Sequence, residues 1–407
     1  MIAALSILRL ACSVPLALAQ VRTQRRWRRV APAIVAGDTW PLVTIAVPAH
    51  DEAAVIGKTV ASLQSMRHPG GPSKLEVIVV DDGSTDDTAD VARSAATGPV
   101  SVRVISQTSS KKAGALNRAF AEANGELVVV VDADTVVDPG FVEAILPHFA
   151  DKGVGAVAGN VRVGNQQTVF GKLQALEYVV SLNLDRRAQA AANVMAVVPG
   201  AAGAFRRSAV LAAGGYSTDT LVEDADLTVS LLADGWRITY EPRAVAFTEA
   251  PETIRDVIRQ RRRWSFGTVE VIAKHHRNLF ERRSGRVGLI GLPWMLLSQV
   301  VLPLVGPLTD LFLLYLLLVH NLSGAAGILV VATGLDLLIC ALMVMANREP
   351  LRMLLWVPLL RLVWRPIQLF TVAASASRWL DGREEAWQKV RRYGSVSSSL
   401  VDYPRAV

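Results

Sequence analysis

The feature that most constrains this chain of 407 residues is its division into two kinds of segment. Residues 40–250 alternate short β-branched runs with polar helical patterns, whereas long apolar stretches follow Arg286. The first kind buries its strands in a sheet covered by helices, and the second is long enough to cross a bilayer. The mean hydropathy of +0.32 is high for an ordinary soluble protein and agrees with this division. The sequence therefore predicts an α/β domain attached to membrane helices.

The net charge of +7 arises largely from basic residues that flank the apolar segments. Five arginines lie between Arg22 and Arg29, directly after the first apolar run. Such positive flanks are typical of membrane proteins that face an anionic inner leaflet, so we expect a lipid bilayer and no nucleic acid as partner. Two cysteines, Cys12 and Cys340, are too few for a disulfide framework, and their position in apolar runs predicts buried thiols.

Changes in composition divide the chain into six predicted segments. They are a transmembrane or interfacial helix (1–21), a basic linker (22–39), a cytoplasmic α/β domain (40–250), an amphipathic membrane-proximal segment (251–286), transmembrane and interfacial helices (287–380) and a cytoplasmic tail (381–407). We expect Pro293, Pro303 and Pro307 to break the apolar stretch 287–320. Arg361 and Arg365 indicate that the last apolar region is interfacial or packed against protein.

Three apolar runs, at 43–47, 77–80 and 128–131, predict strands that are buried on both faces. Helical patterns at 55–66 and 88–96 separate them, and strands that alternate with helices imply a mostly parallel sheet. In such a sheet, ligands bind outside the carboxyl ends of the strands. Polar residues directly after these runs are therefore candidates for a functional site.

Acidic residues follow all three predicted strands, as His50-Asp51-Glu52, Asp81-Asp82-Gly83-Ser84 and Asp132-Ala133-Asp134. A turn with a helix cap would account for the second group alone, and a solvated loop would account for an isolated Asp-x-Asp. Their shared position at strand ends favours a binding site instead. Asp132 and Asp134 provide the oxygen ligands that suit a hard divalent cation, which would bridge to a diphosphate.

Two further groups have both an ordinary and a functional interpretation. Lys112, in Lys111-Lys112-Ala113-Gly114, is either half of a surface pair or an ammonium beside phosphate oxygens. The small residues at 200–203 would let the backbone approach a ligand closely. Glu223 and Asp224 precede a helix expected over 226–234, where they either stabilise its dipole or accept a proton from a hydroxyl nucleophile.

The segment Gln260-Arg261-Arg262-Arg263-Trp264 lies just before the apolar region. Arginines in this place usually contact lipid headgroups, and this interpretation accounts for most of them. It does not account for Gln260 and Trp264 at helical spacing with Arg263. An indole stacks on a sugar ring, and an arginine binds a pyrophosphate with forked hydrogen bonds.

Taken in order, these motifs resemble the membrane-embedded family 2 glycosyltransferases, the group of cellulose, hyaluronan and poly-N-acetylglucosamine synthases. The likeness covers residues 40–394, including Trp387-Gln388-Lys389 after the last apolar helix. It implies a GT-A α/β fold, a nucleotide-sugar donor with UDP as the favoured nucleotide, a glycan acceptor, and Mg²⁺ or Mn²⁺ as cofactor. Val222 departs from the threonine that is usual before Glu-Asp, and His50-Asp51-Glu52 stands where Tyr-Asn-Glu is common. The chain also shows one N-terminal apolar run where several relatives have two.

The resemblance also implies a role for each matching residue. The expected roles are catalysis by Asp224 as general base with Glu223 beside it; donor binding by Glu52, Asp81, Asp82, Lys112, Asp132, Gln260 and Arg263; metal binding by Asp132 and Asp134; and acceptor binding by Trp264.

We therefore expect an inverting transferase in the inner cell membrane that extends a β-linked glycan from the cytoplasmic side, with polysaccharide export subunits as possible partners. A non-processive enzyme that glycosylates a polyprenyl phosphate, lipid phosphate or glycolipid is the alternative. A non-catalytic membrane scaffold agrees less well, because all the expected carboxylates are present. The sequence contains neither a phosphate-binding P-loop nor a dinucleotide fingerprint.

Overall fold

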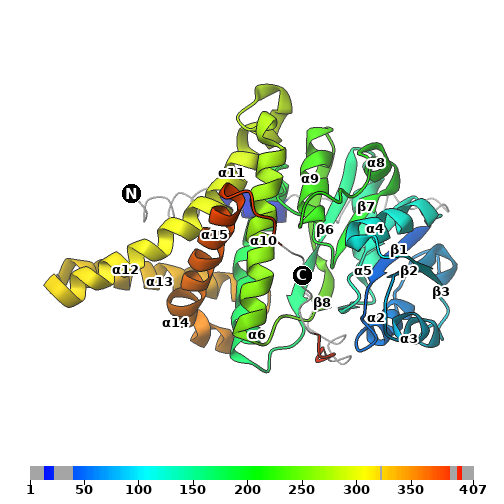
Figure 1. The fold of residues 1–407 in the computed structure, drawn as a ribbon, viewed down its shortest axis with the longest axis horizontal. Helices are drawn as coiled ribbons and strands as arrows, with labels where there is room; N and C mark the ends of the chain where they lie inside the picture. The colour runs from blue at the N-terminus through cyan, green and yellow to red at the C-terminus, as the bar shows by residue number, and fades with distance from the viewer. Residues whose placement is uncertain (1–12, 23–39, 321–322, 386–391, 397–407) are drawn as a thin grey trace.

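The computed structural model describes residues 13–22, 40–320, 323–385 and 392–396. An α/β domain occupies one side of the molecule and a group of apolar helices the other, with the long helix α10 between them (Figure 1). The predicted linker and much of the predicted tail lie outside the described residues.

Eight strands form one mixed sheet in the order β3-β2-β1-β4-β7-β6-β8-β5. Strand β1 pairs in parallel with β2 and β4, β2 pairs in parallel with β3, and β6 with β8. Strands β7 and β5 run antiparallel to their neighbours. The prediction of a mostly parallel sheet is confirmed. The strands are β1 Val43–Ala49, β2 Leu75–Asp82, β3 Ser101–Gln107, β4 Leu127–Val130, β5 Thr135–Val137, β6 Val154–Val163, β7 Gly203–Arg206 and β8 Arg237–Thr248.

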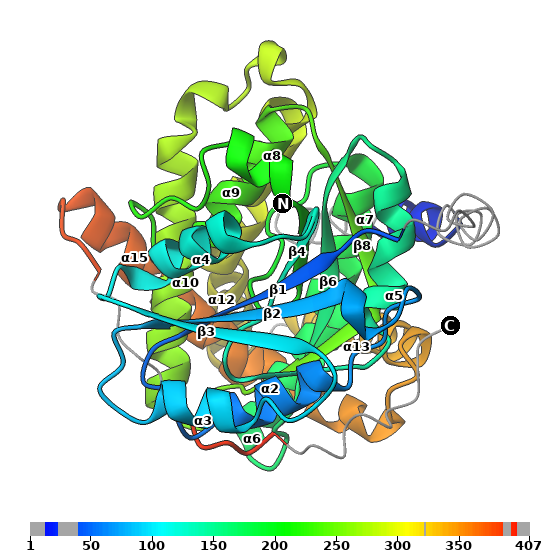
Figure 2. The same ribbon diagram turned by 90° about the vertical axis from the view of Figure 1, so that its right-hand side faces the viewer.

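The central strands are apolar on both faces because helices cover both sides of the sheet (Figure 2). Along β1, Ile45 packs into one buried cluster together with α2, whereas the next residue, Ala46, packs into the opposite cluster together with α4. Such alternation follows from the period of two along a strand. The helices of this domain are α2 Ile56–Gln64, α3 Thr88–Ser94, α4 Lys111–Glu122, α5 Phe141–Ile145, α6 Val169–Glu177, α7 Asn183–Ala192, α8 Arg207–Ala212, α9 Glu223–Ala233 and α10 Ile254–Lys274.

Two helix starts bear on the site. Helix α9 begins at Glu223, earlier than the sequence predicts, with Glu223, Asp224 and Asp226 all in its first turn. Acidic side chains there stabilise the positive end of the helix dipole. Helix α10 begins after Thr253, whose hydroxyl accepts a hydrogen bond from the backbone N–H of Asp256 (3.2 Å). This cap fixes where the Gln260–Trp264 motif starts along the helix.

Among the described residues, three helical stretches are long and apolar enough to cross a membrane: Val287–His320, Gly324–Ala346 and Leu351–Leu380. They contain η6 Val287–Gly291, α11 Leu292–Leu296, η7 Leu297–Val301, α12 Leu302–His320, α13 Ser323–Ala346, η8 Leu351–Trp356, α14 Val357–Leu359, η9 Leu360–Trp364 and α15 Arg365–Leu380. Helices α12 and α13 form a hairpin that projects away from the sheet (Figure 1).

The prolines do not break the first stretch as the sequence predicts. The helix continues through Pro293, Pro303 and Pro307, with π-helical turns η6 and η7 on either side of α11. A wider turn relieves the contact between a proline ring and the preceding turn, so the helix does not end at Pro293 or Pro303.

Four charged side chains meet inside these apolar stretches and form the membrane charge cluster: Asp310, Asp336, Arg361 and Arg365. Arg361 lies 3.0 Å from Asp310 and 3.4 Å from Asp336, and Arg365 lies 2.9 Å and 2.8 Å from the same two carboxylates. The two arginines are thus packed against protein partners on α12 and α13, as charged groups in an apolar segment require.

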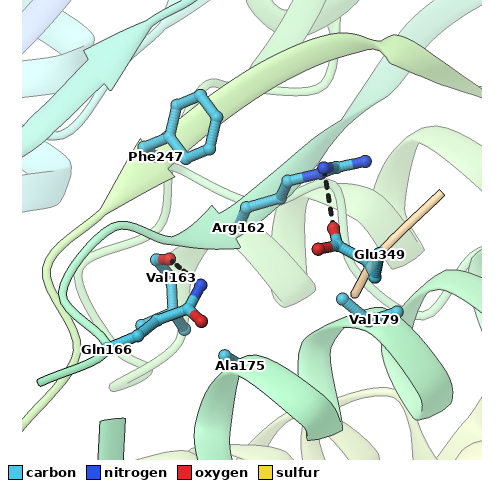
Figure 3. A pocket seen from close by; sticks show the side chains of 7 residues that line it. All are labelled: Arg162, Val163, Gln166, Ala175, Val179, Phe247 and Glu349. Atoms are coloured by element: carbon cyan, nitrogen blue, oxygen red, sulfur yellow. Dashed lines mark hydrogen bonds and ion pairs between the residues drawn. The ribbon is translucent and has the colours of Figure 1, made fainter. Parts of the chain in front are cut away.

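A second buried ion pair joins the α/β domain to the apolar helices. Arg162 of β6 lies 2.8 Å from Glu349, which follows α13, and both side chains are almost fully buried. Figure 3 shows this pair beside Phe247 and Gln166 at a cavity of about 20 Å³. A space of that size holds about one water molecule and no sugar. The pair therefore connects the two regions mechanically and does not line a ligand pocket.

Residues 13–22, the described part of the predicted N-terminal helix, are helical. The side chain of Gln20 donates a hydrogen bond to the backbone carbonyl of Tyr240 in β8 (3.1 Å), and Ala17 is buried. This part of the segment therefore lies against protein. Residues 1–12 lie outside the described residues.

Candidate active site

The carboxyl ends of β1, β2 and β4 meet at one edge of the sheet, because β1 pairs in parallel with both neighbours. This arrangement brings the three acidic groups of the sequence onto the same edge. Ala49 at the end of β1 is in register with Asp81 of β2, and Asp132 follows shortly after β4.

Lys112, Asp132, Glu223 and Asp224 form the site cluster. The Nζ of Lys112, in the first turn of α4, lies 2.6 Å from Oδ1 of Asp132 and 3.5 Å from Oε1 of Glu223. Burial alone would lower the pKa of Lys112, but the charges of Asp132, Glu223 and Asp224 raise it above its ordinary value. The lysine is therefore held in its charged form beside three carboxylates.

The carboxylate of Asp224 has an altered acidity. Burial, followed by the charge of Glu223, raises its pKa to about 6, although Lys112 acts in the opposite direction. A carboxylate with this pKa is ionised at neutral pH and accepts a proton more readily than an exposed aspartate.

Gly200 holds the backbone close to this cluster. Its N–H donates a hydrogen bond to Oδ2 of Asp224 (3.3 Å), and a Cβ at this position would lie 2.9 Å from Nζ of Lys112. A larger residue would displace the lysine. Val222, at the position where the resemblance leads us to expect threonine, packs against α10, since a Cβ on Gly267 would lie 2.7 Å from its side chain.

The two aspartates of β2 have different surroundings. Asp82 accepts hydrogen bonds from Gln107, Ser109 and both the backbone and the hydroxyl of Ser110, at 2.8 to 3.3 Å. These bonds order the loop that leads into α4. Within the part of the chain that the structure describes, Asp81 accepts one bond, from the backbone N–H of Ser84 (3.2 Å), so more of its carboxylate remains for a ligand.

Asp134 lies beside the described part of the tail. Its Oδ2 is 2.7 Å from Nε of Arg392, and the hydroxyl of Thr248 donates to its Oδ1 at 3.3 Å. Burial alone would lower the pKa of Arg392, but nearby acids, chiefly Asp134, Glu52 and Glu249, raise it, and Asp132 contributes as well. The guanidinium of Arg392 thus lies near both aspartates of the Asp-x-Asp motif and near Glu52.

Helix α10 brings the Gln260–Trp264 motif to the same region. Burial lowers the pKa of Arg263, although the charges of Glu223, Asp132 and Asp224 act in the opposite direction. Gln260 is 5% exposed, and its Oε1 has no hydrogen-bond partner in the described parts of the chain. A buried amide oxygen without a partner is costly, so this oxygen is suited to a ligand donor.

The interpretation of the other two arginines as lipid-facing is wrong. Arg261 is 8% exposed and forms an ion pair with Glu177 (2.5 Å), while Arg262 pairs with Glu385 (2.8 Å). Glu177 ends α6, and Glu385 follows α15, the helix against which α10 packs. Charge patterning near a membrane segment could not reveal partners so distant in the sequence.

The carboxylates suit a divalent cation that is completed by its substrate. Within the described ranges, no group of three or more His, Cys, Asp or Glu residues is arranged to hold a metal by itself. Mg²⁺ is commonly bound by one or two carboxylates together with substrate phosphates. Asp132 and Asp134 supply two such carboxylates, and their present partners, Lys112 and Arg392, are cations. The residues therefore fit the predicted cofactor.

Sequence reasoning missed the contributions of Gly200 and Arg392. The run of small residues at 200–203 indicated close backbone approach, but not that one N–H would contact Asp224. The tail resembled a family segment, yet no pattern joined Arg392 to Asp134.

This sheet and its acidic edge correspond to one class of protein, the glycosyltransferases with a GT-A-like fold. Residues 41–267 match the family described as "Glycosyltransferase like family 2", and the chain belongs to that family. The predicted resemblance is confirmed, and the protein is a glycosyltransferase. Its three long apolar helices indicate a membrane protein.

Curated relatives include the poly-beta-1,6-N-acetyl-D-glucosamine synthase of Staphylococcus aureus (strain COL), 31% identical over 233 residues that cover 57% of this chain and 56% of the relative. The synthase of the same name from Staphylococcus epidermidis is 30% identical over the same length. The match thus spans about half the length of these relatives.

A solved structure, the mannosyltransferase PcManGT from Pyrobaculum calidifontis in complex with GDP-Man and Mn²⁺, is similar with a TM-score of 0.62 and 24% identity. The likeness covers 94% of this chain and 100% of that one, and it supports the predicted fold.

Proposed function

We propose that this glycosyltransferase transfers a sugar, with inversion, from a nucleotide-sugar donor to a growing β-linked glycan at the membrane. The observation that carries the proposal is the site cluster, in which Asp224, a base with a pKa of about 6, lies beside Lys112 and Asp132. The names of the curated relatives make UDP-N-acetylglucosamine the first donor to test.

Asp224 would accept the proton of the acceptor hydroxyl as its oxygen attacks the anomeric carbon. The bond between that carbon and the diphosphate oxygen breaks, and its electron pair leaves with the diphosphate. The backbone N–H of Gly200 holds one carboxylate oxygen of Asp224, which orients the other toward its proton.

The cations near Asp224 would stabilise the leaving group. Lys112 is kept charged by its neighbouring carboxylates, and Arg263 lies within range of the same three acids. When the diphosphate enters, both cations gain a ligand that carries more charge than a single carboxylate. Gln260 would donate its amide N–H groups to the same oxygens or accept from a donor hydroxyl through its unpaired Oε1.

Asp132 and Asp134 would hold Mg²⁺ or Mn²⁺, which supplies Lewis-acid stabilisation of the diphosphate when bound. Arg392 would then have to leave Asp134. The presence of Mn²⁺ together with GDP-Man in the PcManGT complex supports this proposal.

Asp81 would contact the base and ribose, with Asp82 shaping the adjacent loop and Glu52 close by. Trp264 would stack on the acceptor sugar.

The nucleotide-sugar donor would reach the site from the cytoplasm, so we place the domain at 40–250 on the cytoplasmic face of the inner membrane. Basic residues at 277–286, just before the first apolar stretch, support this orientation. The apolar helices would lie in the bilayer, and polysaccharide export subunits would be the partners that receive the product.

The test is a donor panel on the full chain in lipid nanodiscs, in which release of nucleotide is measured with several UDP- and GDP-sugars. One donor should be consumed, and Asp224→Asn should lower the rate by about 10²- to 10⁴-fold. Asp219→Asn is the matched control, because Asp219 is an exposed aspartate that pairs with Lys274. Full activity in Asp224→Asn would remove the proposed base, and a product of one added sugar would indicate a non-processive enzyme.

A further inference from the structure

The guanidinium of Arg261 lies over two indole rings. Its Cζ is 4.6 Å from the ring centroid of Trp264, on the same helix, and 4.9 Å from that of Trp364 in η9. Trp264 is the residue proposed to contact the acceptor, whereas Trp364 belongs to the last apolar stretch and is buried. Arg261 therefore connects Trp264, the residue proposed to contact the acceptor, to the last apolar stretch.

Two further contacts fix the plane of this guanidinium. Its Nη1 and Nη2 donate to the two carboxylate oxygens of Glu177 at 3.0 and 2.5 Å, which is a forked, two-point interaction. Gln368 of α15 donates to the same carboxylate at 3.3 Å. Glu177 ends α6, so α6, α10 and the last apolar stretch all contribute to holding Arg261.

We propose that Arg261 is a positioning residue that sets the plane of the Trp264 indole and thereby aligns the acceptor sugar with Asp224. This inference rests on the proposed function. The guanidinium lies over the Trp264 indole, which is only partly buried, so a sugar would use the part of the ring that remains exposed. Arg261 is itself nearly inaccessible, so it acts through Trp264 and does not touch the substrate.

Replacing Arg261 with lysine distinguishes the positioning role of the planar guanidinium from the effect of its charge. Arg261→Lys keeps a cation for Glu177 but has neither the planar group that lies over the two indoles nor the forked donors. Arg262→Lys is the matched control: Arg262 is the neighbouring arginine of the same motif, and its partner is Glu385.

The experiment uses the full chain in nanodiscs, UDP-N-acetylglucosamine (or the donor that the panel selects) and a β-linked N-acetylglucosamine tetramer as acceptor. Arg261→Lys should raise the acceptor KM about ten-fold and shorten the product, while the donor KM stays within about two-fold. Arg262→Lys should leave both constants near their wild-type values. A parallel rise of both KM values in Arg261→Lys, or an unchanged acceptor KM, would overturn the inference.

Trp364→Phe provides a second variant should Arg261→Lys fail to purify as a folded protein. It should raise the acceptor KM in the same direction by a smaller factor, and an acceptor KM equal to that of the wild type would again overturn the inference. A wild-type protein that transfers no sugar from any donor would instead overturn the proposed function. The two failures are therefore distinguishable.

Discussion

The site cluster and the membrane charge cluster are both groups of four charged side chains, but they differ in balance. In the membrane charge cluster, two arginines each contact the same two aspartates, so the charges cancel. In the site cluster, one lysine lies among three carboxylates. Burial, together with the negative charge of Glu223, raises the pKa of Asp224 to about 6. A balanced cluster needs no further partner. The excess of acid at the site makes it suitable for an incoming cation or for taking up a proton.

Among substitutions in the two clusters, Lys112→Met in the site cluster should have the largest effect on the transfer rate. Without the lysine, the site keeps three carboxylates and loses a cation for the leaving diphosphate, so kcat should fall by about 10²- to 10³-fold. Nucleotide release under saturating donor measures it. Lys111→Met, at the adjacent position, is the control, and an equal loss in both variants would contradict a specific role for Lys112.

Arg361→Met should have a large effect on stability instead of rate. It leaves two aspartates in an apolar segment with one arginine, and breaking a buried ion pair costs about 3–5 kcal/mol. Thermal unfolding in detergent should show this loss. Combining Arg361→Met with Asp310→Asn should recover most of it, since the remaining charges balance again. Folded Arg361→Met protein that lost activity without losing stability would assign the cluster a role in the reaction.

The pH dependence tests the excess charge of the site cluster. The transfer rate should fall as the pH drops through about 6, because protonated Asp224 no longer accepts the hydroxyl proton. Glu223→Gln removes a like charge that raises this pKa, so the acidic limb should move to lower pH. A profile of initial rates in both proteins measures it, and a limb that stays in place would show that another group controls the rate.

The smallest expected effect is that of Gly200→Ala. The added methyl group would approach Nζ of Lys112 to 2.9 Å and displace it by a fraction of an ångström, so activity should fall about ten-fold. Gly306→Ala in α12 is a matched control, since its added methyl group meets nothing within 4 Å. Equal activities of the two variants would mean that Lys112 adjusts without cost.

The sequence was sufficient to predict the acidic edge because apolar runs and pairing rules determine it. Once the runs before Asp81 and Asp132 are parallel neighbours of β1, their carboxyl ends must meet. It could not distinguish the two aspartates of β2, because the saturation of Asp82 depends on the fold of the loop at 107–110. The contact between Arg392 and Asp134 joins distant parts of the chain, and no periodicity records such contacts.

Every arginine of the membrane charge cluster belongs to the last apolar stretch, and both aspartates belong to the two stretches before it. During synthesis, α12 and α13 would leave the ribosome before the last stretch. Each would enter the bilayer with an aspartate whose arginine partners have not yet been made. The stretch that carries Arg361 and Arg365 completes them only when synthesis reaches it. The full set of ion pairs can therefore form only after the last stretch has been made, and a nascent polypeptide stopped before Arg361 would contain two acids without these counter-ions.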